Sequence, residues 1–149
     1  MKLKLISTLI GMLLVLPGCA AAGDAVLYEY DGSFDDATFE TREAIIAQGL
    51  TIEYVSHVGE MLARTKEDVG GTKDLFANGE IYVFCSASIS RKAMEADLMN
   101  IAHCPYNVFV FETIGEDSKV YVGHRDLPDG SMQPVEDMLE AIAKEATGQ

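Results

Sequence analysis

Two cysteines and two histidines are the residues of this chain best suited to chemistry. Cys85 ends one apolar run, Cys104 begins the next, and His103 precedes it in a His-Cys-Pro tripeptide. Thiolates and imidazoles bind soft metals and haem iron, and the proline turns the chain away from the sulfur. His57 stands at the start of a helical pattern. We therefore take His57, His103 and Cys104 as candidate ligands for haem or a soft metal, with the identity of the metal left open.

The two sulfurs of Cys85 and Cys104 have three possible roles. An even pair of cysteines in an oxidising compartment favours a disulfide. Free cysteines are also among the most buried residue types, which allows an inert reduced pair. Thiolate chemistry with a metal, haem or a redox partner is the third role. The spacing is not C-x-x-C, so no thioredoxin-like motif, zinc knuckle or covalent haem attachment is indicated.

The chain contains no recognisable catalytic constellation. Ser86, Ser88 and Ser90 lie near no evident base in the sequence, and the nucleophile motif G-x-S-x-G does not occur. We therefore expect binding rather than catalysis and assign no catalytic residue.

A set of basic residues could form an anion-binding spot on an otherwise acidic surface. Its members are Arg64, Lys66, Lys73, Arg91 and Lys92. A solvated face with ion pairs four residues apart is the ordinary alternative. The segment Gly70-Gly71-Thr72-Lys73 lacks the spacing of a phosphate-binding loop and indicates the end of a helix.

The first residues indicate export. Two early lysines, an apolar stretch over residues 5–16 and a run of small residues form a signal peptide over 1–18. The apolar stretch is shorter than the roughly 20 residues that span a bilayer. Leu-Pro-Gly before Cys19 resembles the lipobox of bacterial lipoproteins, which predicts lipidation of Cys19; cleavage after residue 22 is the alternative. Either route predicts a periplasmic or lipid-anchored protein that touches the membrane only through its anchor.

The charge of the chain limits its partners. The formal net charge is −13, from 24 acidic and 11 basic residues. Such a chain repels nucleic acid and anionic membrane surfaces. We expect no nucleic-acid partner, while a protein partner in the cell envelope remains open.

The apolar patterns predict a single α+β domain over residues 26–147, preceded by a tether over 19–25. Strands are expected at 26–30, 50–55, 82–84, 106–111 and 120–123, and helices at about 33–48, 58–69, 88–100 and from 131 onward. The runs at 82–84 and 106–111 lack a polar face, which predicts central strands buried on both sides. This order predicts a sandwich in which helices pack on one face of a mixed or mainly antiparallel sheet.

Three segments resemble a known family. They are HVGEMLART at 57–65, FCSASISRKAMEAD at 84–97 and NIAHCPY at 100–106. The chain is similar through them to exported members of the domain-of-unknown-function 302 family, over about residues 26–123. The resemblance implies a compact α+β sandwich that tends to form a homodimer. It implies no secure activity, although haem binding has been discussed for exported relatives.

Two functions follow as expectations. The first is a non-catalytic envelope module that holds haem or a soft metal. The alternative is a structural or interaction dimer with no cofactor, stabilised by a disulfide between Cys85 and Cys104.

Overall fold

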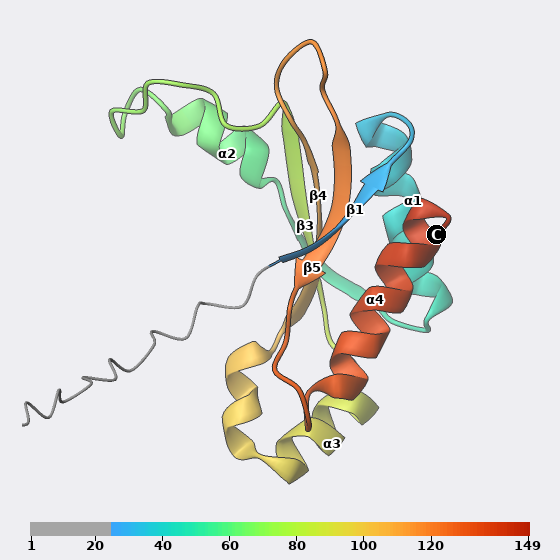
Figure 1. Cartoon of the computed structure of the whole chain (residues 1–149). Helices are drawn as coiled ribbons and strands as arrows, with labels where there is room; N and C mark the ends of the chain where they lie inside the picture. The colour runs from blue at the N-terminus through green and yellow to red at the C-terminus, as the bar shows by residue number, and fades with distance from the viewer. Residues whose placement is uncertain (1–24) are drawn as a thin grey trace, which may run out of the picture.

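The computed structural model describes residues 25–149 (Figure 1). The expected signal peptide, the tether before residue 25 and the lipidation site Cys19 lie outside this range. No helix between residues 25 and 149 combines the length and the hydropathy needed to cross a membrane.

Five strands form one antiparallel sheet in the order β1-β5-β4-β3-β2. The strands are β1 Ala25–Tyr30, β2 Ile52–Ser56, β3 Asn78–Phe84, β4 Tyr106–Glu112 and β5 Val120–Arg125. The strand β4 occupies the centre and β3 lies beside it, so the two apolar runs do form the middle of the sheet. The expected α+β class and the mainly antiparallel sheet are confirmed.

The helices are α1, α2, α3 and α4, with a short 3₁₀ helix, η1, after α3. Their bounds are α1 Phe34–Ala47, α2 Val58–Thr65, α3 Ala87–Ala96, η1 Leu98–His103 and α4 Gln133–Thr147. In Figure 1, α1 and α4 lie side by side on one face of the sheet, as expected, while α2 lies on the opposite side and α3 at one end.

The ends of α1 are set by local sequence. The Ser33 side chain accepts a hydrogen bond from the backbone N–H of Asp36 and donates one to the Asp36 carboxylate. These bonds satisfy a backbone donor that the first turn of a helix leaves free. At the other end Gly49 adopts φ +73°, the left-handed conformation that glycine takes without steric cost. Both signals are visible in the sequence.

The core lies between the sheet and the pair α1 and α4. Val108, Val110 and Val122 point from the inner strands toward Val135 and Ile142 of α4, and all five side chains are fully buried. Burying a side chain of this kind stabilises the fold by about 1.5–3 kcal/mol. The single layer of helices therefore accounts for the core.

The opposite face of the sheet is largely open. Residues that alternate with the core positions on β3 and β4, such as Ile81, Val83 and Phe109, are only half-buried. The prediction that these strands are buried on both sides is therefore wrong. Both faces are apolar, but α1 and α4 cover only one of them, and on the other face α2 packs against β3 and leaves the rest open.

The segment after β3 also differs from expectation. It forms α3 and then η1, and the helices meet at Asp97, whose carboxylate accepts a hydrogen bond from the N–H of Met99. Because an aspartate side chain competes for backbone donors, it interrupts the expected continuous helix at this point.

Candidate functional site

The antiparallel pairing of β3 and β4 brings the two cysteines together. Phe84 ends β3 opposite Tyr106 at the start of β4, and Cys85 and Cys104 lie just beyond this pair. Their sulfur atoms are 3.3 Å apart, and both thiols are free and half-buried. Sequence left open whether the sulfurs meet, because parallel strands would have separated them.

The electrostatics at this thiol pair favour the neutral form. Burial, and to a lesser extent the hydrogen bond to Cys104, together raise the pKa of the Cys85 thiol to about 11. A low thiolate fraction at neutral pH makes Cys85 a poor nucleophile. The geometry is suited to forming a disulfide under oxidising conditions rather than to thiolate catalysis.

Other buried polar groups lie near the thiol pair. Burial raises the pKa of Tyr106. Within residues 25–149, the hydroxyls of Tyr106 and Ser90 and the Nδ1 atom of His103 are buried without a hydrogen-bond partner. Buried polar atoms without a partner lower the stability of the folded state. This end of the sheet is therefore not packed by apolar side chains alone.

His103 closes η1 and lines a void of only about 10 Å³ beside Tyr106 and Arg125. A space of this size holds about one water molecule. Across residues 25–149, no three side chains of His, Cys, Asp or Glu gather closely enough to hold a metal ion. His103 therefore does not join Cys85 and Cys104 in a three-donor set.

His57 lies at the other end of β3, in a separate cluster. Its Nδ1 atom is 3.0 Å from Glu80 Oε1, and the buried hydroxyl of Tyr82 donates a hydrogen bond to Glu80 Oε2. Arg42 covers the Tyr82 ring at 5.0 Å. Burial makes the largest contribution and the hydrogen bond to Glu80 the next, and together they raise the pKa of Tyr82 far above its usual range.

The distance along β3 keeps His57 away from the thiol pair. Cys85 is five positions beyond Glu80, the partner of His57, and a strand rises about 3.3 Å per residue. His57 and Cys104 are therefore too far apart to bind the same metal ion. The interaction of His57 with Glu80 is between distant parts of the sequence, and no local pattern predicts it.

The open face of the sheet forms an apolar trough of about 420 Å³. Leu27, Ile81, Phe109 and Phe111 line it, and Phe76 closes one end by packing edge-on against Phe111 at 5.5 Å between ring centroids. The missing polar alternation in β3 and β4 was the sequence signal for this surface. We call it the open face below.

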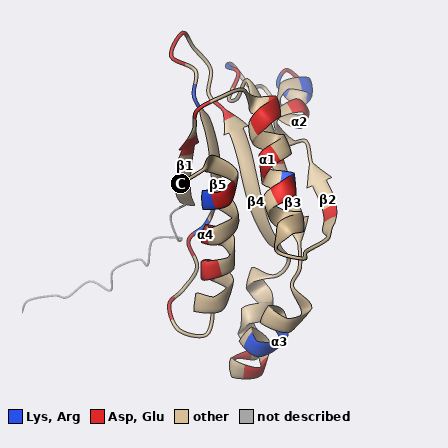
Figure 2. Cartoon of the chain, turned by 90° about the vertical axis from the view of Figure 1, so that its right-hand side faces the viewer, with Lys and Arg blue, Asp and Glu red and all other residues tan. Residues whose placement is uncertain are grey.

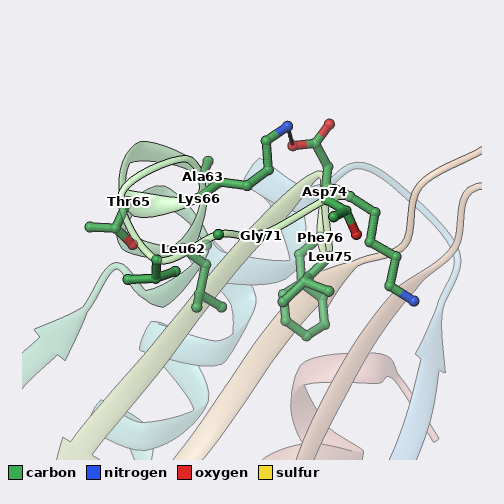
Figure 3. Close-up of a pocket in the computed structure, with 13 residues that line it drawn as sticks. Leu62, Ala63, Thr65, Lys66, Gly71, Asp74, Leu75 and Phe76 are labelled. Atoms are coloured by element: carbon green, nitrogen blue, oxygen red, sulfur yellow. Dashed lines mark hydrogen bonds and ion pairs between the residues drawn. The ribbon is translucent and has the colours of Figure 1, made fainter.

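A second hollow of about 290 Å³ lies between α2 and the segment that leads into β3 (Figure 3). Lys66 and Lys73 both line it, while Arg91 and Lys92 lie on α3 at the far end of the molecule. The five residues therefore do not form a single basic spot, and Arg91 instead pairs with Glu95 four residues on, as in the alternative. Only two of the five residues, both lysines, share a site.

Comparisons with known proteins agree with this fold. No curated protein matches the chain. A solved structure, the crystal structure of an uncharacterized conserved DUF302 protein from Bacillus stearothermophilus, superposes with a TM-score of 0.64 at 12% identity, covering 82% of this chain and 97% of that one. The model of the family described as domain of unknown function DUF302 matches residues 26–149. The chain belongs to the DUF302 family.

Proposed function

We propose that this protein is a non-catalytic interaction module of the cell envelope that pairs with a second copy of itself through the open face. The single observation that carries the proposal is this uncovered apolar surface. Leu27 on β1 is 46% exposed there, and Tyr54 on β2 is 63% exposed. Contiguous apolar surface of this kind usually marks an interaction site.

Charge favours a second copy as the occupant. Figure 2 shows acidic residues along α1 and α4, which cover the face of the sheet opposite the open face. On the open face, the strand register within the described chain places two charged residues, Glu29 on β1 and Arg125 at the end of β5, and Glu29 is paired with Lys119 at 2.8 Å. Two copies of a chain with net charge −13 can meet with least repulsion through this face, which leaves both acidic helical layers pointing outward.

The area of the open face is close to the minimum that a specific dimer interface needs. Five strands spaced about 4.8 Å apart, each with about six residues rising about 3.3 Å, give a face of roughly 480 Å². Two such faces bury about 1,000 Å², the lower limit for a specific interface.

The thiol pair completes the proposal. In an oxidising compartment Cys85 and Cys104 form a disulfide that ties the ends of β3 and β4 across α3 and η1. Export and the lipid anchor rest on the N-terminal sequence. Labelling cells with radioactive palmitate tests the anchor: the full chain incorporates label, and the Cys19→Ala chain does not.

Matched aspartate substitutions test the open face. We expect Leu27→Asp to convert a dimer to a monomer, because it places a charge in the apolar contact. Ile46→Asp is the control, since Ile46 is similarly exposed, at 55%, but lies on α1. Sedimentation velocity measures both. A monomeric wild-type protein, or equal effects of the two substitutions, would contradict the proposal.

A second candidate function is soft-metal or haem binding by the reduced thiol pair. Two sulfurs 3.3 Å apart support it, since soft monovalent copper accepts thiolate ligands. Titrating the reduced protein with Cu(I) and with haem tests it. Binding that is lost in Cys85→Ser or Cys104→Ser but kept in His57→Ala supports this function, and no binding to the wild-type protein rejects it.

A further inference from the structure

The hollow beside α2 has a rim held by an ion pair and a backbone hydrogen bond, and an apolar interior. The Lys66 side chain reaches across to Asp74 above the hollow, with 2.8 Å between Lys66 Nζ and Asp74 Oδ1 (Figure 3). The backbone N–H of Gly71 donates a hydrogen bond of 2.7 Å to the carbonyl of Lys66. A side chain at Gly71 would come within 2.9 Å of that carbonyl, so a glycine is required for the turn.

The interior is lined mainly by apolar side chains. Leu62 comes from α2, and Leu75 and Phe76 come from the returning segment. Two of the apolar lining residues remain well exposed, Val69 at 78% and Leu75 at 52%. An alkyl chain lying in the hollow would remove this surface from water, which is favourable in proportion to the area covered.

The charge at the rim differs in sign from that of the whole protein. The charged lining residues are Lys66, Lys73 and Asp74, a local net charge of +1 on a chain of net charge −13. Lys66 is paired with Asp74, whereas Lys73 makes no ion pair or side-chain hydrogen bond within residues 25–149. Because charges beyond about 8 Å are screened at physiological salt, Lys73 can attract an anion locally despite the acidic surface.

From these features we propose that the hollow binds a single-chain amphiphile, with its alkyl chain in the apolar interior and its anionic headgroup on Lys73. A volume of about 290 Å³ is at the lower end for ligand cavities and fits a chain of medium length. This site adjoins the open face, with which it shares Phe76, but its other apolar lining residues Leu62 and Leu75 lie outside that face, and it does not use the thiol pair.

The first test is a chain-length series of carboxylates from hexanoate to dodecanoate, titrated calorimetrically below their micelle concentrations. We expect one saturable site per chain and an affinity that rises about fourfold per added methylene until the hollow is full. Decyl phosphate and decanoate distinguish a phosphate from a carboxylate headgroup. Decyltrimethylammonium, which has a cationic head, binds at least about tenfold more weakly.

Two pairs of variants locate the site. Lys73→Gln lowers the affinity for decanoate about threefold, while the exposed Lys92→Gln control on α3 leaves it unchanged. Ala63→Phe fills the hollow and abolishes binding, while Ala96→Phe, also on α3, does not. Since Lys73 is exposed, its variant tests the proposal even where Ala63→Phe fails to fold. No saturable binding, an affinity independent of chain length, or equal affinity for the cationic amphiphile would overturn the proposal.

Discussion

Oxidation of Cys85 and Cys104 should stabilise the fold by a calculable amount. The sulfur atoms are 3.3 Å apart in the reduced form, and a disulfide needs about 2.05 Å, so closure requires only a small side-chain movement. The cysteines are 19 positions apart in the chain. Closing a loop of about 20 residues lowers the entropy of the unfolded chain enough to stabilise the native state by about 3 kcal/mol.

This stabilisation should be visible in the melting temperature. For a domain of about 125 residues, an entropy of unfolding of about 2.1 cal/mol/K per residue makes 3 kcal/mol equivalent to a rise of roughly 11 °C in Tm. The assay is differential scanning calorimetry of the oxidised protein, the reduced protein and the Cys85→Ser/Cys104→Ser variant. Mass spectrometry under non-reducing conditions confirms the loss of two protons on oxidation.

The double serine variant should melt like the reduced protein and should not respond to reductant. Equal melting temperatures for the oxidised and reduced wild-type protein would refute the account of the thiol pair. So would the absence of a disulfide after exposure to an oxidising glutathione buffer.

Three further predictions concern packing and pH. Gly59→Ala should destabilise the protein by about 1–3 kcal/mol in urea denaturation, because its new Cβ would lie 2.6 Å from the backbone N of Gly79; Gly79→Ala meets nothing closer than 3.5 Å and should cost less. Burial raises the pKa of Glu136, so its contribution to stability is present below its unfolded pKa and is lost as pH rises through the folded value. The stability of Glu136→Gln relative to wild type should therefore rise as the pH increases above the ordinary range of a glutamate carboxyl, and a constant difference would contradict this. The pKa of Cys85 is also raised, to about 11, so the reduced protein should lose stability relative to the oxidised protein as pH increases above about 9; parallel curves would show that the thiol is not buried as described.

Sequence predicted the parts of the fold that depend on local chemistry. Ser33 with Asp36 and the left-handed Gly49 fixed the ends of α1, because caps act within one turn of a helix. A glycine-containing turn at Gly115, with φ +130°, joins β4 and β5, and a glycine between two apolar runs is a local signal of such a hairpin. The order of elements and the α+β class followed from these signals and from the apolar periodicity.

Long-range contacts could not be predicted in the same way. The meeting of Cys85 with Cys104 depended on an antiparallel register between strands that a helical segment separates. The contact of His57 with Glu80 joins two segments more than twenty positions apart, and it places His57 at the opposite end of β3 from Cys85. Periodicity also cannot distinguish a strand covered on two faces from one whose second apolar face is open, as Ile81 and Phe109 show.

Buried polar groups were missed for a related reason. His124 is fully buried in β5, with its Nδ1 atom 3.6 Å from Glu136 of α4, whereas the strand expected from the sequence ended at residue 123 and left His124 outside it. Within the described residues its Nε2 atom has no hydrogen-bond partner. A single histidine after an apolar run gives no indication that the strand continues or of what its side chain contacts.

Self-association through the open face is the central claim, and a dilution series of amide NMR spectra on residues 25–149 tests it most directly. We expect concentration-dependent shifts that cluster at Leu27, Ile81, Phe109 and Tyr121, with residues on the outer faces of α1 and α4 unchanged. Spectra that do not change with concentration, or shifts that cluster on α1 and α4, would contradict the claim.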